Sequence, residues 1–396
     1  MVAALTLRHP MQTISRMAER VIPRARIEYN NKPLVELTVS DSVRRHLKPL
    51  HAVQQPPLVG RVVASYCDQR DKILNSAVKK DYRFLPERMR FPATRAYVIP
   101  GFLGFRPPRA YLDEIASAFE HGVAFVSVSD EATLWQDGRH LILGGPKPAV
   151  QPDWPLEVAT VLSRILADQI LQKLLAARDG REPPSRIALI GHSKGGLIVH
   201  GIAAAARLAK TGRWETLFKV FPNLQAIDHK DLENLLHKLE EANKFAIATP
   251  FDGIGKKALL AARASGFTWL FAGAEDRFSP DYLEKYYDTL NFDPTEGLDA
   301  VVFASLSNSD LPNRAGFANP FVAIADYAFH LGGATLASGE SDGLVDGQNR
   351  VFASRIMIPN QTHLTVFEDP ESARQTREGF AAAIKKGDPK VDRLLN

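Results

Sequence analysis

The sequence predicts an α/β protein in which a mostly parallel sheet is covered by helices on both faces, a three-layer sandwich. From residue 95 onward, short apolar runs alternate with longer segments whose apolar residues recur at helical spacing. Strands that alternate with helices form parallel sheets, joined by right-handed crossovers. The composition is globular, with 45% hydrophobic and 24% charged residues among 396. No apolar run reaches the roughly 18 residues of a transmembrane helix.

Six short runs are predicted as strands because they are apolar at successive positions, as expected for strands buried on both faces. They are Ala96–Gly101, Val123–Val128, Arg186–Ile190, Phe245–Ala248, Ala300–Ala304 and Arg355–Ile358. Three segments between them have the apolar spacing of helices. They are Pro108–Glu120, Pro155–Ala177 and Gly195–Leu208.

The segment from Thr211 to Asn243 is also predicted to be helical. Four leucines share one side of it, at positions 232, 235, 236 and 239. Two interpretations stay open: a helical cap over the sheet within residues 211–243, or a longer crossover between two strands.

The distribution of charge divides the chain into a basic N-terminal extension, residues 1–90, and a main domain, residues 91–396. The extension holds 17 Lys and Arg against 8 Asp and Glu, whereas the rest holds 32 against 37. A basic segment is suited to an anionic membrane surface, or to the acidic body of its own chain. The aromatic-interleaved basic runs of RNA-binding proteins are missing, so no nucleic-acid partner is expected. Within the extension, Leu34–Val39 alternates like a strand.

The N-terminus and the cysteine content bear on location and metal content. Met1–Arg26 lacks the long apolar stretch of a secretory signal peptide, so we expect a cytoplasmic protein or export without a standard signal. The single cysteine, Cys67, excludes an intramolecular disulfide and a cysteine-built zinc site.

The segment most informative about chemistry is Gly191-His-Ser-Lys-Gly195, a G-x-S-x-G pentad. A β-branched strand ends just before it and an apolar helix begins just after it, which is the strand–turn–helix setting of a nucleophile elbow. The tight turn strains the serine backbone, so residues two positions to either side must lack a Cβ. Ser193 is therefore the candidate nucleophile. The alternative is that Ser193 is only a helix N-cap.

A serine nucleophile needs a base and an acid that orients the base, and in this kind of fold both follow the serine in the order acid, then His. His363 is the candidate base because it lies in a polar loop after the last apolar strand. His330 stays open as an alternative. Asp342 and Asp276 are the candidate acids, and the alternative for each is that it is only a turn residue.

Three segments together resemble the bacterial triacylglycerol lipases of the α/β-hydrolase superfamily. They are Ile99–Phe105, similar to the early strand-end loop; Ile190–Gly196, similar to the elbow; and Gly339–Val345 followed by His363-Leu364, similar to the acid loop and base. Thr249–Gly253 is similar to the loop that those enzymes carry after the next strand. The resemblance covers residues 95 to 370.

The resemblance implies a three-layer α/β-hydrolase sandwich with Ser193 as nucleophile, Asp342 as acid in preference to Asp276, and His363 as base. It implies an oxyanion hole built from the backbone amides of Phe102 and Lys194. The chain departs from the pattern at Thr365, where secreted members often place an aspartate that helps to bind calcium. We therefore expect neither a metal site nor a cofactor.

The predicted function is hydrolysis of carboxylic esters, with lipid esters favoured, through an acyl-enzyme. The apolar loop Phe102–Phe105 suits an acyl chain, and packing explains it equally well. The alternatives are a phospholipase, thioesterase or acyltransferase with the same triad. A non-catalytic interaction protein with this fold is a further alternative, against which the intact Ser, Asp and His set argues. Fold does not fix the acyl chain, the alcohol or the oligomeric state.

Overall fold

The chain divides into two compact units, Met1–Asp81 and Tyr82–Asn396. The computed structural model describes residues 28–29, 32–33, 82–84, 92–101, 107–128, 154–178, 180–254, 278–305, 341–342, 345, 350–363 and 365–387. In the first unit, β1 (Glu28–Tyr29) pairs antiparallel with β2 (Lys32–Pro33). The strand predicted at Leu34–Val39 lies outside the described residues. Among the helices that the structure describes, none has the length and apolarity to cross a membrane.

Seven strands form one sheet in the second unit, in the order β3-β5-β4-β6-β7-β8-β9. They are β3 (Tyr82–Phe84), β4 (Thr94–Ile99), β5 (Val123–Ser127), β6 (Arg186–His192), β7 (Asn243–Ile247), β8 (Ala300–Ser305) and β9 (Arg355–Pro359). β3 runs antiparallel to β5, and all other neighbours pair in parallel. The six parallel strands are those predicted from the apolar runs. β3 lies within the basic segment of the sequence, but it pairs with this sheet.

The two faces of the sheet carry separate hydrophobic cores because successive strand residues point to opposite faces. In β4, Tyr97 and Ile99 belong to one core cluster, whereas Ala96 and Val98 belong to the other. β6 alternates in the same way between the two clusters. Both faces are therefore buried, which explains why these strands read as continuous apolar runs.

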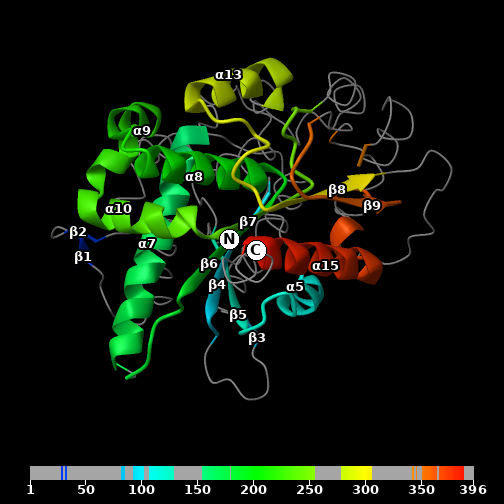
Figure 1. Cartoon of the computed structure of the whole chain (residues 1–396), viewed down its shortest axis with the longest axis horizontal. Helices are drawn as coiled ribbons and strands as arrows, with labels where there is room; N and C mark the ends of the chain where they lie inside the picture. The colour runs from blue at the N-terminus through cyan, green and yellow to red at the C-terminus, as the bar shows by residue number, and fades with distance from the viewer. Residues whose placement is uncertain are drawn as a thin grey trace, which may run out of the picture. The chain divides into compact units, whose positions relative to one another are not determined.

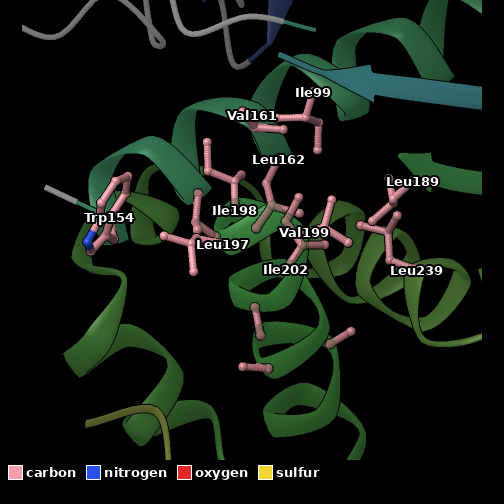
Figure 2. Packing of buried hydrophobic residues seen from close by; sticks show 14 of the residues in the cluster. Ile99, Trp154, Val161, Leu162, Leu189, Leu197, Ile198, Val199, Ile202 and Leu239 are labelled. Carbon is pink, nitrogen blue, oxygen red and sulfur yellow. The ribbon is translucent and has the colours of Figure 1, made fainter. Parts of the chain in front are cut away.

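Helices cover both faces (Figure 1). On one side lie α7 (Trp154–Arg178), α8 (Lys194–Lys210) and α13 (Pro280–Leu290); on the other lie α5 (Arg109–Ala116) and α15 (Pro370–Gly387). The core cluster that contains Tyr97 and Ile99 is called the first core. Figure 2 shows Val161 and Leu162 of α7 facing Ile198 and Ile202 of α8 across it. This arrangement confirms the predicted three-layer α/β sandwich, and its order of strands and helices places β6 and α8 at the centre.

The helical segment between β6 and β7 packs beside α8. It comprises α9 (Trp214–Val220), the 3-10 helix η3 (Pro222–Ala226) and α10 (His229–Glu240). α10 contacts α8 and α7, and its four leucines 232, 235, 236 and 239 are buried in the first core. The predicted helical character of residues 211–243 is thus present, and the helical cap stays a prediction.

Candidate active site

Ser193 occupies a strained turn between β6 and α8. It is not a glycine, yet its backbone has φ 51° and ψ −121°. Such conformations are costly and concentrate at functional sites. The Ser193 N–H donates to the carbonyl of Ile247 at the end of β7, 2.8 Å away, and the Ser193 carbonyl accepts from the Gly196 N–H at 3.0 Å. Hydrogen bonds thus fix both the N–H and the carbonyl of Ser193. The turn has the strand–turn–helix geometry of a nucleophile elbow.

The two glycines of the pentad leave no room for a side chain. A Cβ on Gly191 would lie 2.4 Å from the carbonyl oxygen of Gly195, and a Cβ on Gly195 would lie 2.2 Å from that of Ile99. Both obstacles are backbone atoms, which cannot rotate away. A Cβ on Gly101 would lie 2.9 Å from the Cβ of Ser193. The end of β4 therefore lies directly against the elbow, where the sequence predicts the oxyanion loop. Phe102 itself lies outside the described residues.

Asp342 and His363 form a buried, hydrogen-bonded pair. His363 Nδ1 lies 2.7 Å from Asp342 Oδ2, and the His363 N–H donates to the Asp342 carbonyl at 3.0 Å. The other carboxylate oxygen, Oδ1, accepts from the Val345 N–H at 2.7 Å. Asp342 is 1% exposed and His363 is 3% exposed. The carboxylate contact at Nδ1 thus fixes the orientation of the imidazole. The second ring nitrogen, Nε2, takes no part in that contact.

His192 connects this pair to the elbow. Its ring centroid lies 5.1 Å from that of His363 and 4.6 Å from that of Phe367. Because His192 directly precedes Ser193, the Ser193 turn and the Asp342–His363 pair lie at the same end of the sheet, beyond the carboxyl ends of the parallel strands. Open α/β sheets bind ligands at this edge. Sequence reasoning did not identify His192 or Phe367 as neighbours of His363, since no spacing along the chain indicates the contact.

Two threonines close the turn that carries His363. The Thr362 N–H donates to Thr365 Oγ1 at 2.8 Å, the Thr365 N–H donates to Thr362 Oγ1 at 3.1 Å, and the two hydroxyl oxygens lie 3.0 Å apart. Both residues are buried. This reciprocal pattern resembles a capping box at the start of η5 (Thr365–Phe367). The T-x-x-T spacing is a sequence signal that could have identified it.

Replacing Thr365 with valine should destabilise the protein. The change removes the acceptor of the buried Thr362 N–H, which costs about 1–3 kcal/mol in the free energy of unfolding. Thr365→Ser keeps the hydroxyl and should restore the stability. Urea denaturation measures the effect, with Thr289→Val on the exposed face of α13 as control. Equal stability of Thr365→Val and wild type would contradict this role.

The other histidines that the structure describes after Ser193 lie elsewhere in the fold, and two of the predicted candidates are not described. His229 and His237 are exposed on α10. His200 is fully buried in α8, where its Nε2 lies 3.1 Å from the carbonyl of Asp293 and its ring packs against Tyr287 and Phe292. Burial lowers the pKa of His200 from its ordinary 6.5 to about 4. Asp276 and His330 lie outside the described residues.

The buried His200 should make folding sensitive to mild acid. Between pH 6.5 and pH 4 the unfolded chain binds a proton at this imidazole that the folded chain does not, so stability falls as the pH falls. The full difference is on the order of 3 kcal/mol. We expect His200→Gln to lose less stability than wild type from pH 7 to pH 4 in urea denaturation. His229→Gln, on the exposed face of α10, is the control. Parallel pH profiles for wild type and His200→Gln would contradict this assignment.

Within the described ranges, no group of three or more His, Cys, Asp or Glu side chains is placed to hold a metal ion. Thr365 stands where secreted members of the resembled family often have an aspartate that helps to bind calcium. Its hydroxyl group is hydrogen-bonded to Thr362. Among the described residues, Asp342 contacts His363 directly, and the Thr362–Thr365 turn adjoins it.

Comparison with known proteins reveals distant structural similarity. No protein-family model matches the chain, and no curated protein matches it. Similar solved structures include Bacillus licheniformis lipase BlEst2 in mature form, with TM-score 0.35 and 16% identity over 72% of this chain and 92% of that chain. Esterase B from Lactobacillus rhamnosis has TM-score 0.40 and 14% identity over 89% and 99%. A Pyrobaculum calidifontis esterase has TM-score 0.33 and 13% identity over 87% and 99%. All three are named as lipases or esterases, but at these values the likeness says nothing about the chemistry of this chain.

Proposed function

We propose that the protein is a serine hydrolase of carboxylic esters, with Ser193 as nucleophile, His363 as base and Asp342 as the acid that orients the base. The observation that carries the proposal is the strained Ser193 turn beside a buried His363–Asp342 pair. The order serine, acid, histidine along the chain is that of α/β-hydrolases. A serine that served only as an N-cap would have extended backbone angles and would accept from the helix, whereas Ser193 has φ 51° and makes no side-chain capping bond.

The proposed reaction is acyl transfer in two steps. His363 Nε2 takes the Ser193 proton as the oxygen attacks the ester carbonyl, and the collapsing intermediate expels the alcohol, which receives that proton from His363. Water, deprotonated by the same imidazole, then attacks the acyl-enzyme; the bond to Ser193 breaks, His363 returns the proton to the Ser193 oxygen, and the acid is released. Asp342 holds the imidazole in the tautomer with its proton on Nδ1 and stabilises the imidazolium that forms. No cofactor enters these steps.

The backbone N–H groups of Lys194 and Phe102 are the proposed oxyanion donors. In the trans peptide between Ser193 and Lys194, the carbonyl points toward the Gly196 N–H inside α8. The Lys194 N–H points the opposite way, out of the helix N-terminus, where the positive end of the helix dipole also acts. Donors fixed in advance at a developing negative charge are a large part of the catalysis of acyl transfer.

A graded series of p-nitrophenyl esters, from acetate to palmitate, tests the proposed activity. We expect saturable hydrolysis by the purified protein, with a preference for longer chains if lipid esters are the substrates, as the apolar sequence Phe102–Phe105 suggests. Phosphatidylcholine, an acyl-CoA thioester and an added alcohol acceptor distinguish the phospholipase, thioesterase and acyltransferase alternatives. The absence of turnover with every acyl compound would favour a non-catalytic interaction protein.

A further inference from the structure

A buried ion pair lies beside the proposed nucleophile and has no role in the mechanism above. The Lys194 ammonium lies 3.2 Å from Glu157 Oε2, and the two side chains are 6% and 2% exposed. Lys194 is the first residue of α8 and follows Ser193 directly, whereas Glu157 belongs to the first turn of α7. The pair thus joins the elbow to the neighbouring helix.

Stability of the fold does not explain these charges. Moving an ammonium and a carboxylate out of water is costly, and apolar residues at a buried ion pair often stabilise a protein equally well or better. The neighbours of the pair along both helices, Trp154, Val158 and Leu197, are buried apolar residues of one core. Lys194 also lies at the helix end where the dipole disfavours a cation. Buried charges retained beside a reactive group are candidates for a functional role.

The position of Lys194 indicates what the pair can do. Its backbone N–H is a proposed oxyanion donor, and the orientation of that N–H depends on the strained ψ of Ser193. Hydrogen bonds already hold the Ser193 N–H to Ile247 and the Ser193 carbonyl to Gly196. The Lys194 side chain adds a third attachment, to α7. The charged pair is buried, so its field is less screened than that of a pair in water.

We propose that the Lys194–Glu157 ion pair positions the Lys194 backbone N–H as an oxyanion donor and that formation of the acyl-enzyme depends on it. The inference rests on the proposed function. Lys194 and Glu157 act as positioning residues through their side chains, and neither side chain touches the substrate. Loss of the pair should therefore lower kcat and leave KM nearly unchanged, because the ground-state ester carries no developed negative charge.

The double variant Lys194→Met/Glu157→Leu tests the proposal with p-nitrophenyl butyrate. Apolar replacement of both charges should keep the melting temperature near that of wild type. We expect kcat to fall at least about tenfold, within the roughly 10²–10³-fold loss that removal of an oxyanion donor causes. Lys194→Arg keeps the charge and should recover most of the lost rate. A double variant with the wild-type kcat, or an arginine variant no faster than Lys194→Met, would overturn the proposal.

A second ion pair on α7, which is partly buried, provides the control. Arg95 of β4 lies 2.6 Å from Asp168 of α7, and the two side chains are 3% and 17% exposed. Arg95 is near the start of its strand, so it lies at the amino ends of the parallel strands, whereas Ser193 follows the carboxyl end of β6. Arg95→Met/Asp168→Leu should leave kcat per folded molecule unchanged. An equal loss of kcat in this control would show that any loosening of α7 slows the enzyme and would overturn the specific role of the Lys194 pair.

Two further measurements keep the outcome decisive. If the double variant does not fold, Glu157→Gln, which preserves the shape of the side chain, should lower kcat several-fold without a matching change in KM. A wild-type kcat in this variant would overturn the proposal. The wild-type protein distinguishes the two claims: if it hydrolyses no ester, the proposed function fails; if it does and the pair variants match it, this inference alone fails.

Discussion

Replacing Ser193 with alanine should abolish ester hydrolysis, with a loss of at least about 10⁴-fold in kcat, because the proposed acyl-enzyme forms on the Ser193 hydroxyl. The fold should be unaffected. Alanine keeps the Cβ that already occupies the strained turn, and the Ser193 backbone bonds to Ile247 and Gly196 do not involve the hydroxyl. Initial rates with p-nitrophenyl butyrate and a melting curve measure the two effects.

Ser163→Ala is the matched control for this result. Ser163 lies in α7, is partly buried and donates its hydroxyl to the carbonyl of Ala159, so its loss removes a comparable group away from the elbow. We expect wild-type activity for this variant. Substantial hydrolysis by purified Ser193→Ala would exclude Ser193 as the nucleophile.

Replacing Asp342 with asparagine should cost about 10⁴-fold in kcat, the effect of an asparagine at the orienting acid of a serine triad. Asparagine preserves the acceptor for the Val345 N–H at Oδ1. Its amide group cannot both accept from Nδ1–H and stabilise the imidazolium as the carboxylate does, so His363 is left in the wrong tautomer. The variant should fold as wild type does, and steady-state kinetics measure its rate.

Asp276→Asn is the comparison that ranks the two acids. The hydrogen bond between Asp342 and His363 predicts that Asp342→Asn is by far the slower variant. If Asp276→Asn were the slower of the two, the acid of the triad would be Asp276, and the Asp342 contact would be structural.

The elbow could be predicted from the sequence because its requirements are local. Five consecutive residues form the turn, and the glycines at 191 and 195 are required by backbone atoms within the same turn or in the adjacent strand. The parallel strands were also predictable, since burial on both faces leaves an apolar residue at nearly every position. Helices α7 and α8 followed from apolar spacing alone.

The partner of His363 was less accessible from the sequence. Asp342 lies 21 residues away along the chain, and only the folded structure shows that its carboxylate contacts His363. Chain order left both Asp276 and Asp342 as candidate acids, and only the family resemblance favoured Asp342. Phe102, Asp276 and His330 lie outside the described residues and stay predictions.

Some elements were missed although the sequence carries signals for them. α13 begins at Ser279-Pro280, and Asp369-Pro370 precedes α15; Ser279 and Asp369 accept hydrogen bonds from backbone N–H groups of the first helical turn. A capping residue before a proline is a recognised helix start. β3 is different, because three residues at a sheet edge give no period to detect. The contacts of Glu157 with Lys194 and of His192 with His363 join distant segments, and spacing cannot predict them.

Site-resolved labelling with a fluorophosphonate probe tests the central claim most directly. The probe phosphonylates a serine only where a base activates its hydroxyl and donors stabilise the oxyanion. We predict one label per chain, located by peptide mass spectrometry on Ser193, with labelling lost in Ser193→Ala and strongly slowed in His363→Ala. Labelling at a different residue, or a folded wild-type protein that remains unlabelled, would contradict the account.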